Sequence, residues 1–135
     1  MSALIETLKK EHLLIISTLE EVKHLKADTK DGQNKLLEAK DILLSHIERE
    51  DAEFYPPILM AAEKNKYLKQ TLHMFANDMT AISHFVFDFY EQYDILKTDP
   101  DFSNKFEDLL TLLSTRVERE ERILFPRYED LFDHD

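Results

Sequence analysis

The chain has 135 residues, one glycine, no cysteine and a formal net charge of −11 at pH 7. This length predicts a single domain over residues 1–135, and the acidic charge argues against nucleic acid or an anionic membrane surface as a partner. The lack of cysteine excludes disulfides and thiolate chemistry, and one glycine is too few for a Gly-rich phosphate loop, so any metal must be held by His, Asp or Glu.

Membrane association is also not expected from the apolar pattern. No apolar run of signal-peptide length precedes the pair Lys9 and Lys10, and no segment approaches the roughly 20 apolar residues of a membrane span. We therefore expect a cytoplasmic protein.

Turn-forming residues divide the chain into four segments rich in Leu, Glu and Lys. The turns are predicted at residues 28–34, 55–66 and 97–104, and the helices at residues 3–27, 33–54, 67–96 and 100–124. Four long helices joined by short connections predict an all-α, up-down antiparallel four-helix bundle.

In the first predicted helix, His12 interrupts an apolar face. It lies between Leu8 and Ile15 at helical spacing, so its ring should point into the core. A polar group there must be satisfied by a hydrogen bond or by a ligand. The residue pattern leaves both interpretations open.

The second predicted helix carries an HxxxE pair, His46 and Glu50. The pair continues the stripe of Leu36 and Leu43, which favours an interior position over a solvated surface pair. At spacing i and i+4, an imidazole and a carboxylate can converge on one metal ion. Because a buried carboxylate is costly unless it is paired, a metal is one way to stabilise Glu50.

In the third predicted helix, the position that corresponds to His12 holds Met79. Both residues follow an acidic residue and lie within an apolar seam. A thioether is a poor ligand for a site of oxygen and nitrogen donors, so we expect Met79 to pack in the core. His73 and His84 share a face away from the seam and are expected to be exposed.

The fourth predicted helix repeats the second. HIEREDAEFYP (46–56) recurs as RVEREERILFP (116–126), which pairs Glu50 with Glu120 but places Arg116 opposite His46. We expect Asp99 to cap this helix, Pro100 to begin it and residues 127–135 to form a frayed tail.

These motifs together resemble the hemerythrin-like, or HHE cation-binding, family. The resemblance rests on the inward His12, the HxxxE motif that ends in an aromatic residue and Pro, and the LFP-terminated repeat. It covers essentially the whole chain. It implies a bundle that holds a pair of non-haem irons through one His from each of the first and third helices and a His/Glu pair from each of the second and fourth. Such sites would serve in oxygen binding or transport, in sensing iron, oxygen or nitric oxide, or in redox repair.

Matched position by position, His12, His46, Glu50 and Glu120 fit the family's ligand pattern, whereas Met79 and Arg116 do not. Because half of the family's imidazoles are missing, we expect a metal site of at most one ion, iron or another divalent metal, with dioxygen as a further candidate partner. The alternative is a metal-free regulatory or interaction module in which Arg116 replaces the metal's charge. Arg116 would then lie between Glu50 and Glu120; if it instead points outward, Val117 occupies the seam and the site stays free for an ion.

No enzymatic activity is expected from these residues. The chain shows no nucleophile with a matching base. Phosphotransfer through His73 or His84 is disfavoured, because neither lies among the Lys and Gly residues that would admit a phosphoryl group.

Overall fold

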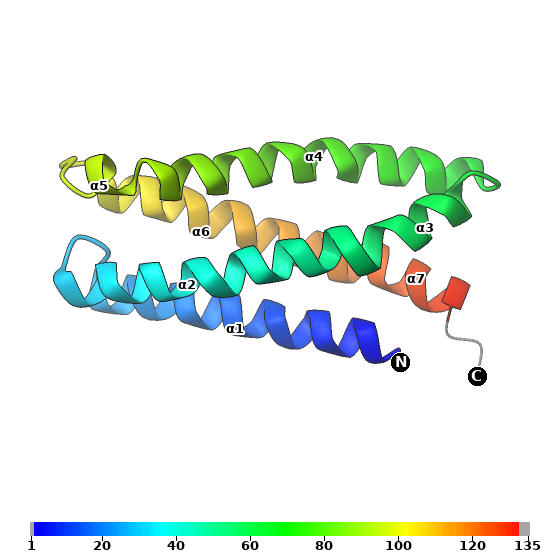
Figure 1. Cartoon of the computed structure of the whole chain (residues 1–135), viewed down its shortest axis with the longest axis horizontal. Helices are drawn as coiled ribbons and strands as arrows, with labels where there is room; N and C mark the ends of the chain where they lie inside the picture. Colours follow the sequence, from blue (N-terminus) through cyan, green and yellow to red (C-terminus); the bar gives the residue numbers. More distant parts are fainter. Residues whose placement is uncertain (1, 133–135) are drawn as a thin grey trace.

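The computed structural model describes residues 2–132 and consists of four antiparallel helical arms (Figure 1). The arms are α1 (Ala3–Leu25), then α2 (Lys30–Arg49) with η1 (Glu50–Phe54) and α3 (Tyr55–Ala62), then α4 (Lys66–Glu91), and finally α6 (Phe102–Arg119) with η2 (Glu120–Leu124) and α7 (Phe125–Phe132). A short helix, α5 (Tyr93–Leu96), follows α4. Residues 2–132 contain no strand, so the predicted all-α bundle is confirmed.

Side-chain caps define the beginnings of three helices. The side chains of Ser2, Thr29 and Asn65 accept backbone N–H bonds at the starts of α1, α2 and α4. Each satisfies a donor that the first helical turn leaves unpaired. The turn before α2 is tight, because a Cβ on Gly32 would collide with the carbonyl of Lys26.

The predicted break at Pro56 is wrong, since the second arm continues as helix to Ala62. The two segments labelled η1 and η2 are π-helical turns, and each ends directly before an aromatic residue and a proline. In η1 the N–H of Tyr55 donates to the carbonyl of Glu50, five residues back. This wider turn comes just before Pro56, which has no backbone N–H to donate. The helix therefore continues through Pro56 instead of ending there.

The fourth arm differs from the prediction at both ends. α6 begins at Phe102, and Asp99 instead accepts the N–H of Asp101 and pairs with Lys105 in the preceding turn. The predicted frayed tail is helical through Phe132, while residues 133–135 lie outside the described part. Within residues 2–132 no helix is both long and apolar enough to cross a membrane.

The apolar interior is divided into two clusters along the bundle. One lies toward the α1–α2 turn and α5, and the other lies among α3, α7 and the beginning of α1. Between them is a layer of buried charged and polar side chains: His12, His46, Glu50, Arg116 and Glu120. The two clusters enclose this layer, whose side chains include all four predicted metal ligands.

Candidate metal centre

The first two arms supply three of the four predicted ligands. His12 projects from α1, and His46 and Glu50 lie one turn apart at the end of α2 and the beginning of η1. Their exposed fractions are 2%, 4% and 1%, so the interior position predicted for each is confirmed. The ring of Phe125 stacks on that of His12 with centroids 5.5 Å apart and restricts its orientation.

The fourth arm brings Glu120 to the same place. Glu120 begins η2 as Glu50 begins η1, and it is 1% exposed. The repeated sequence therefore forms the same backbone structure twice, a π-helical turn that begins at an inward-pointing glutamate. Such π-turns are frequent at functional sites.

One ligand atom from each of the four residues lies within 4.8 Å of the others. His12 Nε2 is 3.0 Å from Glu120 Oε1 and 3.9 Å from Glu50 Oε1, and His46 Nε2 contacts Glu50 Oε1 directly. Two imidazole nitrogens and two carboxylate oxygens thus converge on one point. Donors of this type suit a divalent transition metal.

Two further carboxylates hold the outer nitrogens of the imidazoles. His12 Nδ1 is 2.7 Å from Glu121 Oε2, and His46 Nδ1 is 2.8 Å from Glu11 Oε1. Arg49 in turn donates to the other oxygen of Glu11 at 2.9 Å. A carboxylate can only accept here, so each Nδ1 carries the proton and each Nε2 is directed to the centre, as in many metal sites.

Glu11 and Glu121 were not identified as site residues from the sequence. Each is adjacent in the chain to a predicted ligand, Glu11 to His12 and Glu121 to Glu120. That adjacency is the one signal available, and it is weak. Glu121 supports the His12 imidazole across 109 positions of sequence, a contact that only the fold reveals.

Arg116 points inward, so its outward placement is wrong. It is 6% exposed, donates through Nη2 to the hydroxyl of Tyr55 and through Nη1 to the carbonyl of Phe75 at 3.4 Å, and stacks on the Phe75 ring at 4.6 Å. Tyr55 passes the hydrogen bond on to Glu120 Oε2 at 2.7 Å. The guanidinium therefore lies beside the outer oxygen of Glu120, with Nη2 at 3.7 Å from it.

His73, His84 and Met79 lie as the sequence predicted. His73 and His84 are exposed on α4 and outside the cluster. Met79 is partly buried and packs against the second apolar cluster. Its side chain also lines the central cavity, at the position where a histidine equivalent to His12 would lie.

A small cavity of about 30 Å³ lies at the centre. Its lining includes the four predicted ligands together with Met79, Arg116 and the apolar side chains of Ile15, Leu43, Ile47, Ile82, Leu113 and Val117. Two buried polar atoms of residues 2–132, Glu50 Oε2 and Arg116 Nε, have no hydrogen-bond partner. An unpaired carboxylate oxygen within such a donor set fits a cation, because an unsatisfied buried charge is otherwise costly.

The electrostatics of the centre favour protonated imidazoles beside a charged Glu50. Burial alone would lower the pKa of His12, but its contacts with Glu120 and Glu50 raise it to about 10, and the pKa of His46 is raised by Glu50. Burial would raise the pKa of Glu50, yet the two imidazoles hold it below its usual range. Burial and the charge of Glu50 raise the pKa of Glu120 to about 7. In the metal-free chain, protons therefore supply the positive charge that a metal ion would bring.

Comparison with known families finds a match to the first part of the chain. The family described as Hemerythrin HHE cation binding domain matches residues 1–58, a range that contains His12, His46 and Glu50 but not Glu120. No curated protein and no solved structure matches the chain. The buried cluster of these four residues is of the kind that could hold a metal ion.

Proposed function

We propose that the chain is a hemerythrin-like cation-binding domain, as the match of residues 1–58 to the Hemerythrin HHE cation binding domain supports, and that it binds one iron ion through His12, His46, Glu50 and Glu120. The observation that carries the proposal is the pair of carboxylates behind the imidazoles. Glu121 and Glu11 fix both Nδ1 atoms and present both Nε2 atoms to one point, an arrangement that serves a metal better than a core hydrogen bond.

The ligand chemistry supports iron among the divalent metals. Imidazole and carboxylate donors suit iron, and the chain contains no cysteine to favour softer ions. Two imidazoles with a carboxylate form a set that leaves coordination positions open, and bound iron would supply redox and gas-binding chemistry there. We assign the site a role in sensing iron or oxygen or in redox chemistry, as a binding protein without turnover.

Arg116 limits the site to one ion. Its guanidinium, held by Tyr55 and the Phe75 carbonyl, places a fixed positive charge beside the outer oxygen of Glu120. A second cation near that oxygen would be repelled, and Met79 and Arg116 provide no imidazole for it. The chain's own residues therefore support a mononuclear centre.

The metal content of the purified protein tests this proposal. Protein from iron-replete cells should carry about one iron per chain and an iron-dependent visible absorption, and His46→Ala should lose both. His84→Ala, which changes an exposed histidine, is the matched control and should retain both. A wild-type content below about a tenth of an ion per chain, even after anaerobic reconstitution with Fe(II), would refute metal binding.

A metal-free interaction module is the second candidate, and one observation favours it. The cluster can compensate its own charges, since His12 has a raised pKa and Arg116 is paired with Glu120 through Tyr55. In that case Arg116→Met should destabilise the protein by about 3–5 kcal/mol, because buried Glu120 would lose its guanidinium neighbour and Tyr55 its donor, with His12 left as the one cation beside Glu120. Urea unfolding of the chelator-treated protein measures this change, and a loss below about 1 kcal/mol would count against the module.

A further inference from the structure

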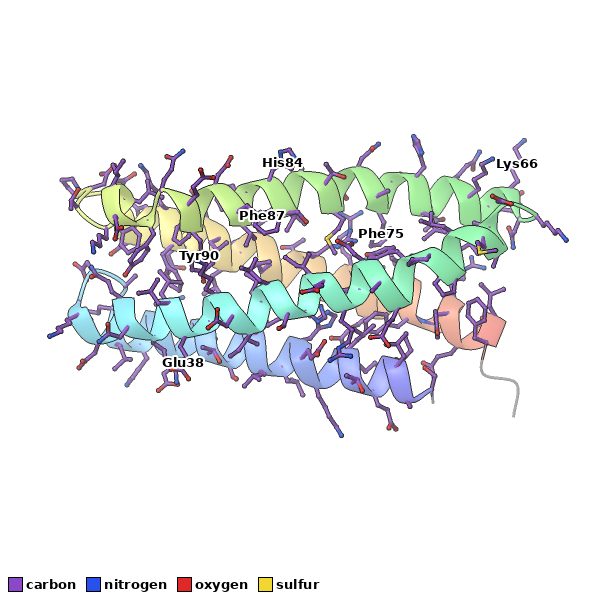
Figure 2. All side chains as sticks on the ribbon, in the orientation of Figure 1. Glu38, Lys66, Phe75, His84, Phe87 and Tyr90 are labelled. Atoms are coloured by element: carbon purple, nitrogen blue, oxygen red, sulfur yellow. The ribbon has the colours of Figure 1, made fainter. Side chains whose placement is uncertain are left out.

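Met79 separates the metal centre from an open groove. The groove, of about 440 Å³, runs between α4 and the η1–α3 part of the second arm, and Figure 2 labels two of its residues, His84 and Phe87. Its lining consists of Tyr55, Leu59, Leu72, Ala76, Met79 and Phe87, with Asp51, Thr80, Ser83 and His84 as the polar members. Met79 also lines the cavity at the centre, and no other residue borders both spaces.

The cavity is otherwise closed on this side. Of its lining residues, all are buried except Met79 and Val117, which are partly buried. The Met79 side chain is unbranched and has three rotatable bonds, so it can change rotamer without moving the helix. Rotation of this one side chain is the smallest movement that would join the groove to the ligand cluster.

The two spaces restrict what could pass. A volume of about 30 Å³ holds a guest of roughly one or two heavy atoms beside the ligands. The groove is mainly apolar and the chain carries a net charge of −11, which together favour a neutral molecule over an anion. The unpaired N–H of Arg116 offers such a guest one hydrogen-bond donor.

We propose that this groove is the access path by which a small neutral molecule of diatomic size reaches the centre, and that Met79 is its gate. The function of this path rests on the proposed metal binding. The path itself is formed by the side chains alone and does not require a metal ion. Met79, which occupies the position of a missing ligand histidine, thus controls access to the centre in addition to packing in the core.

The path can be tested without any metal. In chelator-treated protein with ¹³C-methyl methionine, dissolved dioxygen should broaden the Met79 methyl signal as strongly as those of Met60 and Met74, which are 74% and 59% exposed. A charged gadolinium chelate, too large for the groove floor, should broaden the signals of Met60 and Met74 and leave that of Met79 sharp. Weak broadening of Met79 by dioxygen would overturn the path.

The gate is tested on the Fe(II) protein by stopped-flow binding of nitric oxide. Met79→Ala should raise the association and dissociation rates by about tenfold and Met79→Phe should lower both, with the equilibrium Kd nearly unchanged, because a gate alters the barrier and not the end states. Met74→Ala, on the exposed side of α4, is the control and should match the wild type. A change in Kd with unchanged association rate would overturn the gate, as would a rate increase for Val117→Ala equal to that of Met79→Ala.

The two proposals fail separately. If no metal is retained, the proposed function fails, and the dioxygen measurement on metal-free protein still decides whether the path exists. If iron binds and the Met79 methyl is not reached by dioxygen, the path fails alone. Should Met79→Phe not fold, Met79→Ala and the wild-type methyl signals carry the test.

Discussion

At the scale of single residues, Glu11 and Glu121 determine how the imidazoles meet an ion. Each accepts from an Nδ1 at hydrogen-bond distance, and neither contributes an atom to the central cluster. Each imidazole therefore has its ring orientation fixed before any ion arrives, and it keeps the Nδ1 proton when an ion displaces the proton on Nε2. Preorganisation of this kind raises affinity, because less rotational freedom is lost on binding.

Replacement of Glu121 by glutamine should weaken metal binding without removing a ligand. The amide can still accept from His12 but lacks the charge that makes the imidazole a stronger donor, so we expect the metal Kd to rise by about 10- to 100-fold. Competition with a chromophoric chelator measures this change. Glu118→Gln alters an exposed carboxylate that pairs with Arg122 and should leave the Kd unchanged; equal effects of the two substitutions would deny Glu121 its supporting role.

The raised pKa of His12 predicts a pH dependence of both stability and metal uptake. Because its pKa rises from 6.5 to about 10 on folding, the protonated imidazole stabilises the metal-free protein fully below pH 6.5, and this stabilisation is lost as the pH rises through about 10. A metal ion must displace that proton. Metal affinity should therefore increase with pH, by about tenfold per unit for one released proton between about pH 7 and about pH 9.

Calorimetry in buffers of different ionisation enthalpy would count the released protons. His12→Gln cannot bind the proton and should flatten the pH dependence of metal-free stability in this range. Metal uptake by the wild type without proton release would contradict the charge state assigned to His12.

At the scale of elements, the two halves of the chain share a backbone plan but not a ligand set. Both α2 and α6 pass into a π-turn at an inward glutamate, and both continue as helix past a proline. The divergence lies in two side chains, Met79 on α4 and Arg116 on α6. The second half thus keeps the backbone geometry of the first half, but it lacks the two histidines that would act as metal ligands.

Restoring both imidazoles should add binding capacity. The double substitution Met79→His and Arg116→His removes the guanidinium and supplies two nitrogens next to Glu120, so metal content should rise above the wild-type value, toward about two ions per chain. Met74→His with Arg122→His, at exposed positions of the third and fourth arms, is the matched control. An unchanged metal content in the first variant would mean that α4 and α6 do not present these positions to a common ion.

At the scale of the whole molecule, the polar layer lies between two apolar clusters and joins three arms, while α4 borders it through Met79. His12, His46 with Glu50, Met79 and Glu120 come from α1, the second arm, α4 and the fourth arm in turn. An ion bound by three of these arms would join them at mid-height. Binding and global stability should therefore be coupled.

Thermal unfolding measures this coupling. With free metal at about 100 times its Kd, the folded state should gain about 2.7 kcal/mol, seen as a higher Tm that a chelator reverses. Glu50→Gln, which removes a central oxygen, should show a much smaller metal-dependent shift. Equal shifts in the two proteins would place the stabilising metal at another site.

The sequence by itself determined the four helical arms but not where the second and fourth arms begin or end, together with the inward direction of His12, His46, Glu50 and Glu120 and the repeat that relates Glu50 to Glu120. Helical periodicity and local identity are enough for these, because they depend on neighbours within a few turns. Only the tertiary structure decided that Glu11 and Glu121 support the imidazoles, that Arg116 pairs with Tyr55 beside Glu120, and that Met79 lies between groove and centre. Those contacts join residues from different helices, and their formation depends on how the arms rotate and pack against one another, which a one-dimensional pattern does not encode.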